Sequence, residues 1–202
     1  MDEITYKRLE IMDCTYDILC LSCKTGSYIC EGNVADVIED IPCHIPQDVI
    51  IDFILITGNL GSIEDVTEFF QIFYETVKND ERLREVKIFY VLGAYELYFY
   101  NLPKEAYRAY HRLEMNFYGL YVLVNQVIPY SSCLILGSVG FARHGDEITV
   151  QQCEWFYMVY KQTLRRARIL NCPIVIVTHT PVSSWLPDGE NLDHQCICFY
   201  QE

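Results

Sequence analysis

Residues 49–57, VIIDFILIT, form an almost unbroken apolar run that is rich in β-branched side chains and stops at Gly58. A strand that is apolar on both faces must be covered on both faces, and that is the environment of a central strand in a parallel sheet. Parallel strands are joined by crossover connections, which are usually helices. This one run therefore favours an α/β chain over an all-β or all-helical one.

The rest of the chain repeats the alternation. Apolar runs of strand length predict five further strands, at residues 16–23, 86–92, 119–125, 132–139 and 172–179. Apolar side chains at helical spacing predict helices over residues 32–41, 62–79, 102–117 and 147–170. We therefore expect an α/β fold with a mixed, largely parallel sheet flanked by helices. The expected organisation is a single domain over residues 1–202, with residues 1–15 as an N-terminal extension and residues 186–202 as an irregular tail.

Charge and composition exclude some partners. The formal net charge of −13 disfavours binding to a nucleic-acid backbone, because phosphate recognition needs a basic surface. The acidic, mixed start MDEITYKRLEIMDC is unlike a signal peptide, and the apolar runs are too short to span a bilayer. We expect a cytoplasmic protein that does not bind membranes, with its ten cysteines reduced.

The ends of four predicted strands are the expected place for a site. In open α/β sheets, ligands bind outside the carboxyl ends of the strands. The loops at residues 22–25, 57–60, 93–96 and 178–181 offer Cys23, Lys24, Thr25, Asn59, Tyr95, Glu96 and His179. None of the four loops contains an aspartate, which a hydrolytic two-metal site would need. A nucleophilic Cys23 with His179 as its base is an alternative that these residues leave open.

The order of these loops resembles the calcineurin-like metallophosphoesterase superfamily. Its motifs are, in order, Asp-x-His, Gly-Asp, Gly-Asn-His-Asp/Glu, a lone His and Gly-His-x-His. The segments DILCLSCKTG, DFILITGNLGS, IFYVLGAYELYF and IVIVTHTPVSSW stand in the places of the first four motifs, and the resemblance spans residues 16–185. It implies a metallophosphoesterase-like sandwich and, for an active member, a metal-dependent phosphoric ester hydrolase.

The chain departs from the family at most functional positions. His179 matches a metal-binding histidine and Glu96 a frequent flanking acid. The substituted positions are Cys23 for the first metal-binding Asp, Thr25 for its His partner, Asn59 for the bridging Asp, Ala94 for the metal-binding Asn and Tyr95 for the His that assists the leaving group. The final Gly-His-x-His motif is missing, and only 23 residues follow His179. We expect a fold that is reduced at its C-terminus. Either the domain is simply a smaller version of the fold, or a protein partner or a second copy covers an exposed sheet face.

These departures favour a catalytically degenerate protein that acts as a scaffold or binding module, with no cofactor. They leave enzymatic activity open and favour its absence. One alternative is a phosphoesterase with a rebuilt single-metal site, in which His179 and Asn59, with Cys23 as a further candidate ligand, hold one manganese or zinc ion. Another is a sensor that binds a nucleotide or phosphate without hydrolysis, through Lys24, Tyr95, Glu96 and Arg143.

Overall fold

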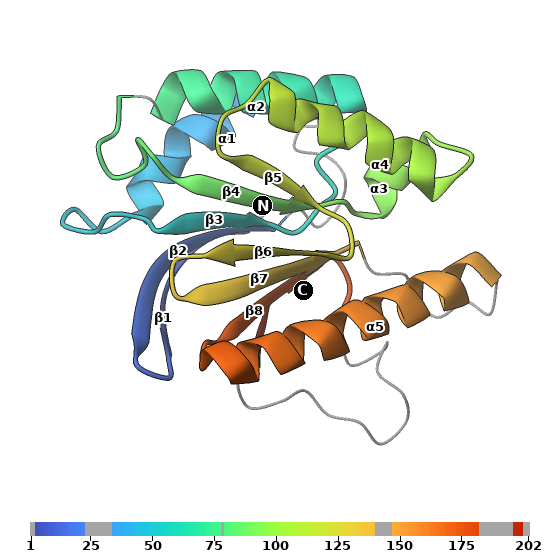
Figure 1. Ribbon diagram of the computed structural model, residues 1–202. Coiled ribbons are helices and arrows are strands. Elements are labelled where there is room, and N and C mark those ends of the chain that lie inside the picture. Colours follow the sequence, from blue (N-terminus) through green and yellow to red (C-terminus); the bar gives the residue numbers. More distant parts are fainter. Residues whose placement is uncertain (1–2, 23–33, 78, 140–146, 182–195, 200–202) are drawn as a thin grey trace.

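The computed structural model describes residues 3–22, 34–77, 79–139, 147–181 and 196–199. They form four layers: three helices, a five-stranded sheet, a four-stranded sheet and one long helix (Figure 1). The chain is thus a mixed α/β protein with two mostly parallel sheets flanked by helices. Among the described residues, no helix combines the length and apolar character needed to cross a membrane.

The first sheet has the strand order β1-β2-β3-β4-β5, and only β1 is antiparallel to its neighbour. Its strands are β1 (Glu3–Ile11), β2 (Cys14–Ser22), β3 (Phe53–Ile56), β4 (Lys87–Val91) and β5 (Leu120–Leu123). The second sheet has the order β6-β7-β8-β9, in which only β6 is antiparallel. Its strands are β6 (Gln126–Tyr130), β7 (Cys133–Ser138), β8 (Ile174–Thr178) and β9 (Cys196–Phe199).

Helices cover the outer face of each sheet. Those on the first sheet are α1 (Val34–Asp40), α2 (Ile63–Val77) and α4 (Pro103–His111), and α5 (Glu147–Leu170) covers the second sheet (Figure 1). A short helix, α3 (Ala94–Tyr98), follows β4, and 3-10 turns occupy Ile41–His44 and Arg112–Met115. Every predicted helix and strand is therefore present in the structure.

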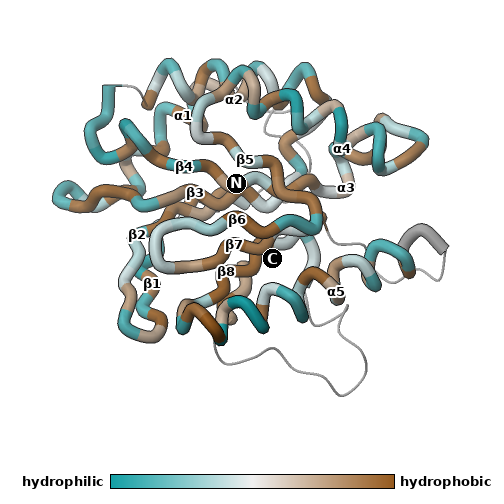
Figure 2. Tube along the Cα trace, in the orientation of Figure 1, coloured by the Kyte–Doolittle hydropathy of each residue, from teal (hydrophilic) through white to brown (hydrophobic). Residues whose placement is uncertain are grey.

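The central strands of the first sheet are buried on both faces, as the run at residues 49–57 predicts. Phe53 and Leu55 of β3 pack between the sheets, whereas Ile54 and Ile56 pack under the helices. All four side chains are at most 1% exposed. Alternation of side chains along a strand divides them in this way. Figure 2 shows the consequence, with hydrophobic strands inside and hydrophilic outer turns on the helices.

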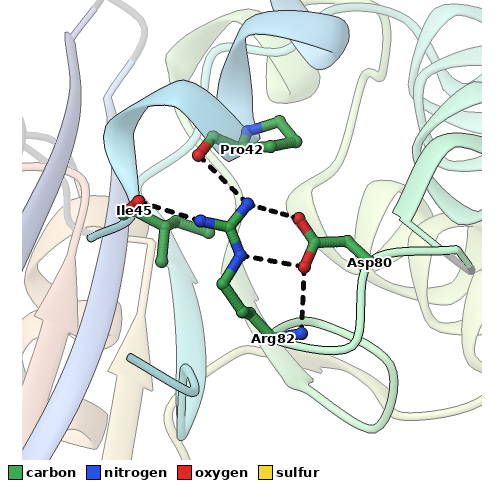
Figure 3. A network of polar contacts seen from close by, with 4 residues as sticks. All are labelled: Pro42, Ile45, Asp80 and Arg82. Atoms are coloured by element: carbon green, nitrogen blue, oxygen red, sulfur yellow. Dashed lines mark hydrogen bonds and ion pairs between the residues drawn. The ribbon is translucent and has the colours of Figure 1, made fainter. Parts of the chain in front are cut away.

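Arg82 ties the loop after α2 to the turn that precedes β3 (Figure 3). Its guanidinium donates to both carboxylate oxygens of Asp80, at 3.0 and 2.6 Å. It also donates to the backbone oxygens of Ile45 and Pro42, at 2.9 and 3.3 Å. A planar guanidinium can bond four acceptor oxygens in this way, which explains why an arginine is needed here. These bonds lower the pKa of Asp80 below its ordinary range.

Three features differ from the sequence predictions. Residues 3–11 are not a separate extension, because they form the edge strand β1 and pair with β2 along its whole length. Residues 196–199 are not irregular, because they form β9 beside β8. The inner face of the first sheet is not exposed, since the second sheet packs on it. A partner is therefore not needed to cover that face.

Candidate functional site

The carboxyl ends of β3, β4 and β8 meet at one edge of the sandwich. The imidazole of His179, directly after β8, reaches across to the first sheet, where Nδ1 lies 2.8 Å from the carbonyl oxygen of Thr57. Thr57 follows β3, and its N–H donates to Leu21 O of β2 at 3.2 Å. The strand ends of the two sheets are thus joined directly, and the predicted convergence of the loops after β3, β4 and β8 is confirmed.

Glycine at position 93 allows these loops to come into contact. A Cβ at Gly93 would lie 2.5 Å from Oδ1 of Asn59 and 2.9 Å from Cε1 of His179. It would also lie 2.7 Å from the backbone nitrogen of Asn59, and real Cβ atoms do not approach other atoms so closely. Gly58 has a φ of +91°, and a Cβ at this position would lie 2.5 Å from the backbone nitrogen of Gly93. Side chains at either position would push the loops apart.

Asn59 adopts a left-handed backbone conformation, with φ of +63°. Asparagine tolerates this region better than most residues, so the local turn favours it. Its Oδ1 accepts a hydrogen bond from the backbone N–H of Tyr95 at 3.1 Å. The side chain that replaces a bridging carboxylate in the family pattern is therefore bonded to the loop after β4.

The Glu96 carboxylate is fully buried and accepts hydrogen bonds from four donors of the protein. Oε1 accepts from the Leu60 N–H at 2.5 Å and from the Tyr90 hydroxyl at 2.8 Å. Oε2 accepts from the N–H groups of Asn59 and Gly93, at 2.9 and 2.7 Å. Two donors on each oxygen match the acceptor capacity of a carboxylate along its lone pairs.

Glu96 therefore joins the loops after β3 and β4 from inside. Its negative charge is balanced by oriented N–H and O–H dipoles, because none of its four partners carries a positive charge. A carboxylate in this position has no oxygen directed to solvent. The same charge acts on Tyr110, whose pKa is raised mainly by burial and further by Glu96.

His179 has a defined tautomer when it is neutral. Because the Thr57 carbonyl can only accept, Nδ1 carries the proton and Nε2 carries the lone pair. Within the described residues, Nε2 has no hydrogen-bond partner. A histidine that donates from one ring nitrogen to a backbone carbonyl has the arrangement that is common among metal ligands.

The donors present do not fit the two-metal centre that the resemblance implies. Among the described residues, no group of three His, Cys, Asp or Glu side chains is close enough to hold an ion. At this edge the described chain offers one imidazole and one neutral amide, while both Glu96 oxygens are already bonded. Ala94 is exposed and brings no ligand atom. Two adjacent divalent ions need carboxylates to balance their charge.

Other predicted residues lie outside the described part. Cys23, Lys24 and Thr25 belong to residues 23–33 and Arg143 to residues 140–146, so neither the Cys23–His179 pair nor the cationic groups can be placed. Tyr95 is half-buried, and its ring lies edge-on to Phe99 at 5.7 Å between centroids.

Two groups of residues at this edge were not predicted from the sequence. The first is Tyr90, whose hydroxyl donates a hydrogen bond to Glu96. A tyrosine inside an apolar strand needs a partner for its hydroxyl, and this could have indicated a buried acceptor nearby. The second is a buried network that links both sheets, in which Ser138 donates to Asn125. Asn125 and Tyr107 both bond Gln152 of α5, at 3.5 and 3.3 Å. No sequence pattern indicated that network.

No protein-family model matches the chain, and no curated protein matches it. The interpretation of the site therefore depends on its own residues and geometry.

Proposed function

We propose that the chain is a catalytically degenerate protein with a metallophosphoesterase-like sandwich, which acts as a scaffold or binding module in the cytoplasm. Two mostly parallel sheets between helices are compatible with such a sandwich. The loops after β3, β4 and β8 meet at one edge of the sandwich, and the resemblance implies a metal centre built from these loops. The proposal assigns them a structural role in place of a catalytic one.

The observation that carries this proposal is how the polar groups of the loops are used. Both Glu96 oxygens accept from protein donors, Asn59 Oδ1 accepts from Tyr95 N–H, and His179 Nδ1 is bonded to the Thr57 carbonyl. Hydrogen bonds within the protein thus hold the loops in place. The loop arrangement can persist with no metal at its centre.

The substitutions also remove the chemistry. An amide at position 59 keeps an oxygen ligand but loses the negative charge that neutralises two cations. Alanine at position 94 provides no ligand at all. Without a bound ion, water keeps a pKa far above neutral and the charge that develops on a phosphoryl group is not stabilised. We therefore expect no phosphoesterase turnover.

One observation favours a second candidate, a phosphoesterase with a single ion. The hydrogen bond from Nδ1 to Thr57 leaves the Nε2 lone pair of His179 available as a ligand, with Asn59 in the adjacent loop. A site of this kind would take a borderline ion such as zinc or manganese. Among the described residues, no carboxylate is available to this site as a metal ligand, so we rank the single-ion enzyme below the scaffold.

Elemental analysis and a turnover assay separate these two candidates. The purified protein would be incubated with manganese or zinc, dialysed, and analysed for metal content and for hydrolysis of a generic phosphodiester. We expect substoichiometric metal and no turnover above the rate without protein.

The test variant is His179→Ala. Its control is His111→Ala, which changes a histidine on α4, away from the loops. Stoichiometric metal together with turnover that is lost in His179→Ala and retained in His111→Ala would refute the scaffold and establish the single-ion enzyme.

A further inference from the structure

The outer face of α2 carries a stripe of carboxylates. The buried side of the helix consists of Val66, Phe69, Phe70, Phe73 and Val77. At 3.6 residues per turn, the direction opposite to this side is occupied by Glu64, Glu68 and Glu75, and all three are exposed. The stripe therefore points straight out from the first sheet into solvent.

The neighbouring helix carries a stripe of the opposite sign. The buried side of α4 and its 3-10 continuation consists of Ala106, Tyr107, Tyr110 and Leu113. The opposite direction is occupied by Lys104, Arg108 and Arg112, which are exposed at successive i, i+4 positions. The chain has 15 basic and 28 acidic residues, so three aligned cations are a local reversal of its overall charge.

Within the part of the chain that the structure describes, none of these six side chains forms an ion pair or a hydrogen bond. An exposed cation without an internal partner keeps its full capacity to bond an external carboxylate. The same holds for the three glutamates of α2.

The two helices lie side by side and run in the same direction (Figure 1). Near the start of α2, the hydroxyl of Tyr110 donates to Gly61 O at 2.8 Å. Further along α2, the rings of Phe70 and Tyr74 lie 5.6 and 5.4 Å from the ring of Phe117, which follows the 3-10 turn. The segment from Arg108 to Arg112 therefore lies near the height of the first turn of α2, which carries Glu64.

We propose that the outer faces of α2 and α4 form a self-complementary surface on which a second copy of the chain docks. A two-fold axis that runs between α2 and α4, parallel to both, places each α2 over the α4 of the other copy. Rotation about this axis does not change the position of a residue along the axis. The acidic stripe of one copy therefore meets the basic stripe of the other. The contact occurs twice, as an isologous interface requires.

The surface of α2 also has a place for an arginine. A shallow hollow of about 520 Å³ is lined by Ile63, Glu64, Thr67, Glu68 and Gln71. An arginine side chain fits such a hollow, because its aliphatic stem packs on apolar groups while its guanidinium bonds carboxylates. The two-fold axis brings the Arg108–Arg112 segment of the second copy, which carries two arginines, toward this region.

The occupant is a second copy because the complementary stripe belongs to the same surface. Exposed apolar side chains at the end of the layer add area to the contact, with Met115 and Tyr118 exposed by 87% and 84%. Repulsion between two chains of charge −13 is screened over about 8 Å at physiological ionic strength, whereas the stripes meet at contact distance. This interface is separate from the strand-end loops, so the metal and turnover measurements do not bear on it.

Charge reversal tests the interface. Sedimentation velocity at physiological salt, from about 1 to 200 µM protein, would compare the wild type with two variants, Arg108→Glu/Arg112→Glu and Glu64→Lys/Glu68→Lys. In a dimer of either variant alone, α2 of one copy and α4 of the other carry charges of the same sign. In a mixed dimer of the two variants, the facing helices carry opposite charges. The matched control is Arg165→Glu/Arg166→Glu on α5, which makes the same charge change on the opposite side of the molecule.

We expect the wild type and the α5 control to dimerise, and each of the other two variants alone to dimerise at least ~10-fold more weakly. We also expect an equimolar mixture of the two variants to recover the dimer, which requires that both are folded. A wild type that stays monomeric over this range would overturn the proposal. So would a wild-type dimer that neither reversal weakens, or a mixture that does not associate.

Discussion

Replacement of Glu96 by glutamine tests whether this carboxylate holds the strand-end loops together. Glutamine keeps nearly the same volume, so the change removes the charge and one acceptor without opening a cavity. Because four donors point at the two oxygens, either orientation of the new amide places its NH2 group against two of them. The wild-type pattern of bonds therefore cannot be rebuilt by rotation of the side chain.

The size of the effect follows from the number of donors left without a partner. With the NH2 at the Oε1 position, Tyr90 can rotate its hydroxyl to accept, but the Leu60 N–H is left facing a donor. With the NH2 at the Oε2 position, two backbone N–H groups lose their acceptor. A buried donor without a partner costs about 1–3 kcal/mol, and a bond to a charged group contributes about 1.5–3 kcal/mol. We expect Glu96→Gln to lower the free energy of unfolding by about 3 kcal/mol or more.

Urea unfolding monitored by circular dichroism measures this difference. Tyr90→Phe removes only one of the four donors and should cost about 1 kcal/mol, which provides a graded comparison if Glu96→Gln does not fold. Glu105→Gln, on the exposed side of α4, is the matched control and should change stability by less than about 0.5 kcal/mol. If Glu96→Gln costs no more than this control, the carboxylate does not hold the loops and our interpretation of the site is wrong.

Three further predictions test other parts of the structure. Gly93→Ala should lower the free energy of unfolding by about 2 kcal/mol or more in urea titrations, since its Cβ would overlap two neighbouring loops; an unchanged midpoint would show that the loops are not in contact. Burial raises the pKa of the Cys133 thiol to about 12, so mass spectrometry should find it unlabelled by a thiol reagent in the native protein while exposed Cys43 reacts; equal labelling would contradict the packing between the sheets. Hydrogen bonds from Arg82 lower the pKa of Asp80 below its ordinary 3.8, so the stabilisation is complete above about pH 4 and is lost as the pH falls through the native value. Asp80→Asn should therefore cost about 1–2 kcal/mol in urea titrations at pH 7 and progressively less as the pH falls below about 4, and a cost that does not change with pH would count against the ion pair.

Long apolar runs predicted the interior of the fold. The segment at residues 49–57 is buried on both faces as β3, because a strand between two apolar layers needs no polar side. The helix at residues 147–170 was found with its bounds unchanged, since 24 residues of helical spacing give a strong signal. Burial dictates these residues, so their pattern is visible in the sequence.

The edges of the sheets were harder to predict. β1 contains Lys7, Arg8 and Glu10, as is expected for an edge strand that faces solvent, and its alternation is too weak to separate from a loop. β9 has only four residues and is held by pairing with β8. Pairing between strands far apart in the chain leaves little trace in the local sequence. That is why residues 196–199 were predicted to be part of an irregular tail.

Glu96 shows why the chemistry of a site is harder to predict than its position. Its place after a buried strand indicated a side chain at the sheet edge, and the structure confirms that location. The sequence could not show that its oxygens turn inward, because that depends on the Leu60 and Asn59 N–H groups, 36 and 37 residues away. A carboxylate bonded by backbone donors organises these loops without an ion. Under the proposed function, this explains how metal ligands can be lost at positions 59 and 94 while the loops around them keep their arrangement.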